Sequence, residues 1–352
     1  MTWTKRLTIL LLLVHSVVWA QDTGGVTLRE RLRQRWLANH ADKAVQPAGS
    51  DNLTAIEKPG DYSYTLQHNG LTRQYRVHVP RSYNRAQPTA LLVSLHGGGG
   101  DMDHQADDTH YGHISASESE GFVAVFPNGY SKLPSGKLAT WNAGTCCGSA
   151  RDQVVDDVGF IRAIIARVRQ QLNVDHNRVY ATGMSNGAMM AYRLACEMAD
   201  TFKAIAAVAG TDNTTQCAPA AAVSVLHIHA QDDDRVLFAG GAGQAFRDAS
   251  SVTNFVSVPA SMAQWVRHDN CQPDPQRILT NAGAYCERYA NCRDGAQVQL
   301  CVTTTGGHSW PGGTKVRGNA PTSHALNAND VMWKFFRSTA SDAAVTMGTK
   351  VR

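Results

Sequence analysis

The chain has 352 residues, of which 43% are hydrophobic and 18% charged, and its formal net charge is +4. This length allows one large or two modest globular domains, and the composition supplies enough apolar residues for a large core. The small net charge argues against a nucleic-acid partner and against binding to an anionic membrane surface.

The first 20 residues have the pattern of a secretory signal peptide. Lys5 and Arg6 precede the apolar run "LTILLLLVHSVV", and compact side chains stand at Val18 and Ala20. This pattern predicts cleavage after Ala20, and the run is too short for a membrane span. Loss of Lys5 and Arg6 lowers the formal charge from +4 to +2. We therefore expect a secreted protein, extracellular or periplasmic, without stable membrane insertion after cleavage.

Residues 21–60 read as a basic helical and linker segment, which we interpret as a solvated segment rather than a membrane-binding one because acidic residues dilute its charge. From Tyr62 to Pro80 the alternating pattern predicts a hairpin that turns at "HNG". Six short apolar runs follow: "ALLVSL" at 90–95, "GFVAVFP" at 121–127, "RVYATGM" at 178–184, "KAIAAVAG" at 203–210, "VSVLHIHA" at 223–230 and "VQLCVTTT" at 298–305.

Amphipathic helical patterns, such as residues 155–172, separate several of these runs. Continuous apolar strands alternating with helices predict an α/β fold with a mostly parallel central sheet flanked by helices. Residues 61–338 would form one catalytic domain, closed by a helix at "NANDVMWKFFRS", and residues 339–352 a C-terminal tail.

The stretch "GMSNG" places Ser185 where an apolar strand gives way to a helical pattern. This is the context of a nucleophile elbow, a sharp turn that exposes a serine hydroxyl at the carboxyl edge of a sheet. Gly183 and Gly187 would let strand and helix pack closely around the strained serine. A plain small-residue turn with a capping serine is the alternative.

A nucleophilic serine needs a histidine as base and an acid that orients the histidine. His308 follows the last apolar run behind two glycines, and it is our candidate base. Asp232, Asp233 and Asp234 follow the run at 223–230, and position alone leaves the choice among the three open.

The glycines of "LLVSLHGGGGD" resemble the oxyanion loop of lipases and esterases, whose backbone amides point inward. We expect the amides of Gly98 and Asn186 to bind the oxyanion, with Gly99 a weaker candidate. A phosphate-binding loop is excluded because no Lys-Ser/Thr pair follows the glycines.

Eight cysteines in an exported chain indicate disulfides rather than metal ligands. We expect Cys292 to pair with Cys301, Cys271 with Cys286 and Cys196 with Cys217. The adjacent Cys146 and Cys147 are either paired with each other or unexplained. Four histidines suggest a metal cluster but follow no ligand pattern, so no metal is expected: His96, His104, His110 and His113.

From Tyr62 to Phe336 the chain resembles the secreted α/β-hydrolase esterases that include polyhydroxybutyrate depolymerases and feruloyl and acetylxylan esterases. The resemblance rests on "LHGGGGD", "FPNG", "WNAGTCCG", "VDDVGFIRAII", "RVYATGMSNGAMMAYRLAC", "HAQDDDRV", "FAGG" and "GGHSWPGG". It implies that Asp233, four residues after His229 in a His-x-x-x-Asp pattern, is the acid. It also implies that Trp141, Trp310 and the "TCCG" loop lie near the substrate.

The resemblance implies a serine carboxylic ester hydrolase that forms an acyl-enzyme and needs no cofactor. Its substrate would be a short polyester oligomer or a hydroxycinnamoyl or acetyl ester. Another α/β-hydrolase activity, such as that of a peptidase or lipase, is the alternative because the triad does not specify the acyl or leaving group. A non-catalytic binding module is less favoured because all three triad residues are present.

Overall fold

The computed structural model describes residues 55–244, 254–314 and 321–349. The expected signal peptide and nearly all of the segment 21–60 lie outside this part of the chain. No helix among the described residues has both the length and the apolar character that crossing a bilayer requires.

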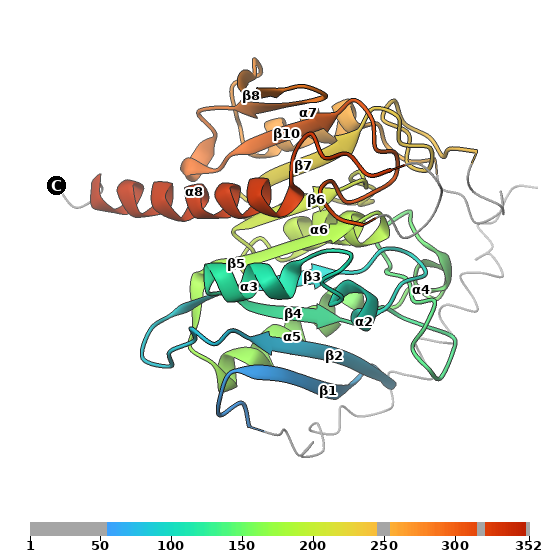
Figure 1. Ribbon diagram of the computed structural model, residues 1–352, viewed down its shortest axis with the longest axis vertical. Helices are drawn as coiled ribbons and strands as arrows, with labels where there is room; N and C mark the ends of the chain where they lie inside the picture. The colour runs from blue at the N-terminus through green and yellow to red at the C-terminus, as the bar shows by residue number, and fades with distance from the viewer. Residues whose placement is uncertain (1–54, 245–253, 315–320, 350–352) are drawn as a thin grey trace, which may run out of the picture. The chain divides into compact units, whose positions relative to one another are not determined.

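A single sheet of ten strands runs through the domain in the order β1-β2-β4-β3-β5-β6-β7-β10-β9-β8 (Figure 1). The strands are β1 (Gly60–His68), β2 (Leu71–Val79), β3 (Thr89–Leu95), β4 (Val123–Pro127), β5 (Val174–Met184), β6 (Ala204–Val208), β7 (Ser224–Ala230), β8 (Gln276–Asn281), β9 (Ala284–Tyr289) and β10 (Val298–Thr303). Every pairing from β4 across to β10 is parallel. The predicted mostly parallel sheet is confirmed.

Helices cover both faces of the sheet (Figure 1). One core contains the apolar sides of α5 (Asp157–Gln171), α6 (Asn186–Glu197) and α7 (Val258–His268). The opposite core contains residues from α3 (His113–Glu120) and α8 (Ala328–Thr349), with α2 (Met102–Gln105) beside them. The short helices α4 (Gly148–Asp152) and η2 (Arg293–Gly295) lie in connections. Strand β3 serves both cores, with Leu91 and Val93 on one side and Leu92 on the other.

The two edges of the sheet are antiparallel hairpins. The hairpin predicted at "HNG" is present, because β1 and β2 pair through a turn at Asn69 and Gly70, both with positive φ. The hairpin of β8 and β9 was not predicted from the sequence. Five of the six β8 residues are exposed, so β8 carries no apolar run, and its pairing with β9 defines it as a strand.

The last helix is longer than the sequence pattern suggested. We expected it to end at Ser338, but α8 continues to Thr349. The residues after Ser338 include no proline, and their only glycine is Gly348, so nothing in this segment stops the helix early.

Two of the expected disulfides are wrong. The structure pairs Cys271 with Cys292 and Cys286 with Cys301. The reason is strand register, since Cys286 on β9 lies directly opposite Cys301 on β10. The other four cysteines form two further bridges: Cys196–Cys217, as expected, and Cys146–Cys147, one of the two alternatives left open.

We expect the Cys286–Cys301 bridge to stabilise the strand that leads to His308. Replacing both cysteines with alanine should lower the free energy of unfolding by about 3 kcal/mol, since the bridge closes a loop of about 15 residues. Urea denaturation of the variant and the wild type measures this difference. Peptide mapping of the unreduced protein is the control, and a linked peptide joining Cys292 to Cys301 would contradict the pairing.

Candidate active site

Ser185 occupies a strained turn between β5 and α6. Its φ and ψ of 57° and −123° lie in a region that residues with side chains rarely adopt, and its amide donates to the carbonyl oxygen of Val208 at 2.9 Å. A Cβ on Gly187 would lie 2.2 Å from the carbonyl oxygen of Leu95, and a Cβ on Gly183 would lie 2.5 Å from the carbonyl carbon of Gly187. The elbow therefore requires glycine at both positions.

His308 and Asp233 are hydrogen-bonded to each other. His308 Nδ1 lies 2.9 Å from Asp233 Oδ2 and 3.1 Å from Oδ1. Both residues follow strands of the parallel part of the sheet, β10 and β7, as Ser185 follows β5. The carboxyl ends of parallel strands meet at one edge, so all three residues lie at that edge.

Asp233 is buried, with 3% of its surface exposed. Burial alone would raise the pKa of its carboxyl group, but the charge and hydrogen bond of His308 and the backbone amide of Arg235 together hold the pKa below its ordinary value. Asp233 is therefore an anion at neutral pH and acts as the acceptor for His308 Nδ1–H.

The neighbouring aspartates differ from Asp233. Asp232 is exposed, and its carboxylate accepts the backbone amide of Gly307 at 2.8 Å, which ties its turn to the loop before His308. Asp234 is exposed as well. Of these three aspartates, only Asp233 forms hydrogen bonds with the His308 imidazole among the described residues.

The glycine loop lies against the elbow. A Cβ on Gly97 would come within 3.6 Å of Ser185 Cβ, and one on Gly98 within 3.5 Å of Asn186 Cβ. The amide of Gly99 donates to the carbonyl oxygen of Ala139 at 2.8 Å. This bond makes Gly99 unavailable as an oxyanion donor and leaves Gly98 as the better candidate of the two. The amide of Asn186 belongs to the first turn of α6, where backbone donors have no partner within the helix.

The side chain of Asn186 has a role that the sequence did not suggest. Its Oδ1 accepts the amide of Trp141 at 2.7 Å, and its Nδ2 donates to the carbonyl oxygen of Trp141 at 3.0 Å. Trp141 in turn donates its indole N–H to the carbonyl oxygen of His96 at 2.9 Å. The residue after Ser185 is thus joined, through one tryptophan, to the start of the glycine loop.

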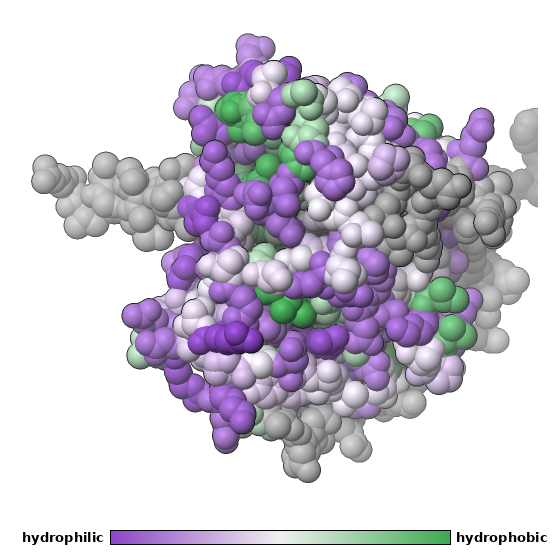
Figure 2. Space-filling model, viewed as in Figure 1, coloured by the Kyte–Doolittle hydropathy of each residue, from purple (hydrophilic) through white to green (hydrophobic). Residues whose placement is uncertain are grey.

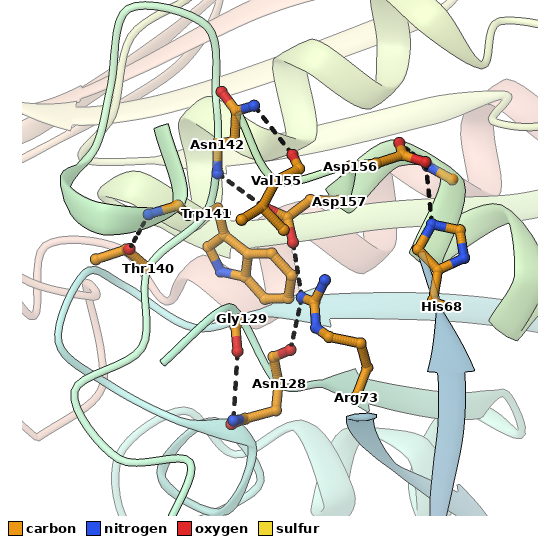
Figure 3. Close-up of polar contacts among 12 residues, drawn as sticks. His68, Arg73, Asn128, Gly129, Thr140, Trp141, Asn142, Val155, Asp156 and Asp157 are labelled. Carbon is orange, nitrogen blue, oxygen red and sulfur yellow. Dashed lines mark hydrogen bonds and ion pairs between the residues drawn. The ribbon is translucent and has the colours of Figure 1, made fainter. Parts of the chain in front are cut away.

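A buried ion pair between Arg73 and Asp157 holds the backbone at Asn142, the residue after Trp141 (Figure 3). Arg73 on β2 donates to Asp157 Oδ1 at 2.7 Å and to the carbonyl oxygen of Asn128 at 3.1 Å. Asp157 Oδ2 accepts the backbone amide of Asn142 at 2.8 Å. Burial raises the pKa of the Asp157 carboxyl group, while the charge of Arg73 opposes that rise. The sequence did not predict this network, because Asn128, Asn142 and Asp157 lie in three separate motifs and nothing in the sequence shows that these motifs meet at Arg73.

Both tryptophans proposed to bind substrate are buried, with 0% of Trp141 and 3% of Trp310 exposed. Trp310 packs edge-on against Tyr111 and His113, with ring centroids 5.5 and 5.1 Å away. The two rings therefore have packing roles in this structure, and direct contact with a substrate stays a prediction.

The four histidines considered as a metal cluster make ring contacts and hydrogen bonds instead. His96 Nδ1 donates to the carbonyl oxygen of Gly97, and burial lowers the pKa of His96 to about 4. His113 bonds Ser94 at 2.7 Å, whereas the rings of His104 and His110 lie against each other. In the described part of the chain, the side chains that come together at metal-ligand distances are Cys196, Asp212 and Cys217. Both of those sulfurs are in a disulfide.

Known proteins resemble this chain in sequence and in fold. The dienelactone hydrolase family matches residues 109–255. Feruloyl esterase B of Piromyces equi is 28% identical over 243 residues, covering 67% of this chain and 42% of that protein. A probable feruloyl esterase C of Aspergillus clavatus is 33% identical over 180 residues, covering 49% and 59%. The structure of an acetyl xylan esterase from Aspergillus awamori superposes with a TM-score of 0.54 at 14% identity, covering 79% of this chain and 99% of that one.

The structural similarity identifies the α/β-hydrolase fold. The sequence matches to feruloyl esterases and to the dienelactone hydrolase family confirm the resemblance to α/β-hydrolase esterases that was inferred from the motifs. The chain spans less than half the length of feruloyl esterase B and about three fifths of the probable feruloyl esterase C.

The contact between His308 and Asp233 predicts an order among three asparagine variants. We expect Asp233→Asn to lower kcat by about 10⁴-fold, because an amide there favours the wrong tautomer of His308. Asp232→Asn retains an acceptor for Gly307 and Asp234→Asn changes an exposed side chain, so each should stay within a few-fold of wild type. Ester hydrolysis by the three purified variants tests this order, and equal losses in all three would contradict it.

Proposed function

We propose that this protein is a secreted serine carboxylic ester hydrolase with Ser185 as nucleophile, His308 as base and Asp233 as acid. The observation that carries the proposal is the bond between His308 Nδ1 and a buried aspartate at the sheet edge where Ser185 occupies its strained turn. The similarity of the chain to feruloyl esterases and to the dienelactone hydrolase family supports the same reaction class.

The bond to Asp233 determines which nitrogen of His308 acts. Nδ1 carries the proton that Asp233 accepts, so Nε2 is free to take the proton of the Ser185 hydroxyl. The serine oxygen attacks the ester carbonyl carbon, and His308 then gives the proton to the departing alcohol. A water molecule then gives a proton to His308 and attacks the acyl-enzyme carbonyl, and the same steps release the acid and restore Ser185.

The negative oxygen of each tetrahedral intermediate needs donors that are already in place. We propose the backbone amides of Gly98 and Asn186 for this role. The packing of Gly97 and Gly98 against Ser185 and Asn186 supports it, as does the positive end of the α6 dipole at Asn186.

Feruloyl or acetyl esters of plant carbohydrates are the substrates that the names of the relatives suggest. Short hydroxybutyrate oligomers are a second class, suggested by the motifs shared with polyhydroxybutyrate depolymerases. Secretion is supported by the pattern of residues 1–20 and by four disulfides.

Replacing Ser185 with alanine tests the nucleophile. The change removes one oxygen, so we expect an unchanged thermal unfolding midpoint and a loss of turnover of about 10⁴-fold or more. A fluorescent phosphonate should label the wild type at Ser185 and leave the variant unlabelled. An active Ser185→Ala protein, or labelling at another residue, would overturn the proposed mechanism.

The substrate preference can be measured with one panel: methyl ferulate, acetylated xylan, hydroxybutyrate oligomers and p-nitrophenyl esters. We expect activity on the soluble esters and oligomers and weak adsorption to polyhydroxybutyrate granules. The face in Figure 2 is mostly hydrophilic, with hydrophobic residues in small separate groups. Tight, salt-resistant binding of residues 55–352 to granules would contradict this and reveal a polymer-binding face on the domain.

A further inference from the structure

A row of buried polar side chains leads from α6 to Asp233. Tyr192 Oη lies 2.7 Å from His227 Nδ1, and His227 Nε2 lies 3.1 Å from His229 Nδ1. His229 Nε2 then lies 2.8 Å from the carbonyl oxygen of Val236 and 3.4 Å from Asp233 Oδ2. The three side chains are at most 1% exposed, and the reaction proposed above uses none of them.

The far end of the row determines the direction of every bond in it. A carbonyl oxygen only accepts, so His229 Nε2 carries a proton and donates it to Val236. Burial lowers the pKa of both His227 and His229, so both rings are neutral and each carries a single N–H. His229 Nδ1 must therefore accept from His227 Nε2, and His227 Nδ1 must accept from the Tyr192 hydroxyl.

This row ends on the turn that presents Asp233. Asp233 Oδ1 accepts the amides of Arg235 and Val236, each at 2.9 Å. Val236 is thus held twice, by Asp233 through its amide and by His229 through its carbonyl. The N–H of His229 also faces Asp233 Oδ2, the oxygen nearest to His308 Nδ1. A rotation of the Asp233 carboxylate away from His308 would strain these contacts.

We propose that Tyr192, His227 and His229 form a positioning relay, which holds the Asp233 carboxylate in the orientation that His308 requires. They are positioning residues and touch no reacting atom. The inference rests on the proposed function, because it gives Asp233 the role of the acid.

Neutral groups suit this task better than charged ones. An arginine or lysine at the place of His229 would bring a full charge that competes with the His308 cation for Asp233. A neutral N–H orients the carboxylate without that competition. Among the described residues, the groups beside the row include Phe238 against His229, Trp265 against Tyr192, and Asp212, which accepts the indole N–H of Trp265. His308 also lies close enough to act electrostatically on His229.

Two substitutions of His229 separate positioning from packing. His229→Leu removes the donor, and we expect kcat to fall about 10- to 100-fold with KM nearly unchanged. The side-chain amide nitrogen of glutamine lies close to the position of Nε2, so His229→Gln should recover most of the lost kcat. If His229 had a purely structural role, the kcat of each variant would instead fall in step with its loss of stability.

The Tyr192 hydroxyl offers a milder test with a matched control. Tyr192→Phe should lower kcat about threefold, because it removes the donor to His227. Tyr180→Phe removes another buried tyrosine hydroxyl, one that donates to the carbonyl oxygen of Phe336 on the opposite face of the sheet, and it should leave kcat unchanged. This pair stays informative even if His229→Leu does not fold.

Nitrogen-15 NMR of the imidazoles tests the bond directions in the wild type. We expect His227 and His229 to carry protons on Nε2 alone and to be neutral at pH 7 and above, and His308 to carry a proton on Nδ1. A proton on Nδ1 of His229, titration of either ring in that range, or unchanged kcat in folded His229→Leu would overturn the relay. Those results would leave the proposed function intact, whereas an active Ser185→Ala protein would remove it.

Discussion

The close approach of three backbone segments around Ser185 is the constraint on which the rest of the site depends. Strand β5, helix α6 and the end of β3 come so near that a Cβ at Gly187 would lie 2.2 Å from a carbonyl oxygen of β3. Because the segments touch through backbone atoms, Ser185 is forced to φ 57° and cannot relax into the helix. The same contact places the glycine loop after β3 beside the serine.

Such a strained turn persists only when its surroundings hold it, and here the surroundings are polar and buried. One connected series of residues runs from the elbow to the β1–β2 hairpin at the edge of the sheet: Asn186, Trp141, Asn142, Asp157 and Arg73. Each link uses a buried donor or acceptor that would cost free energy if left unpaired. The loop that carries Trp141 and Asn142 is therefore held by hydrogen bonds to α6 and α5, and not by apolar packing alone.

Buried histidines do similar work without carrying charge. Burial lowers the pKa of His96 and His113 to about 4, so each keeps a nitrogen with a free lone pair at neutral pH. His96 accepts the amide of Gly129 at that nitrogen and donates from the other to Gly97. A protonated ring would lose the bond to Gly129, so this geometry requires the neutral form. In the same way, each neutral ring of His227 and His229 donates from one nitrogen and accepts at the other, which fixes the direction of the hydrogen bonds near Asp233.

The sequence by itself determined the features whose causes lie within a few residues: the hairpin turn at Asn69 and Gly70, the elbow at Ser185 and the alternation of strands and helices. Their physical origin is local, in backbone freedom and hydrophobic period. Only the tertiary structure decided how the four cysteines from Cys271 to Cys301 pair and which loop Asn186 binds, and it supplied the contact between His308 and Asp233, the acid that the family resemblance implied. The partners in these contacts lie 15 to 75 residues apart, and the register of β9 against β10 and the meeting of strand ends at one edge bring them together.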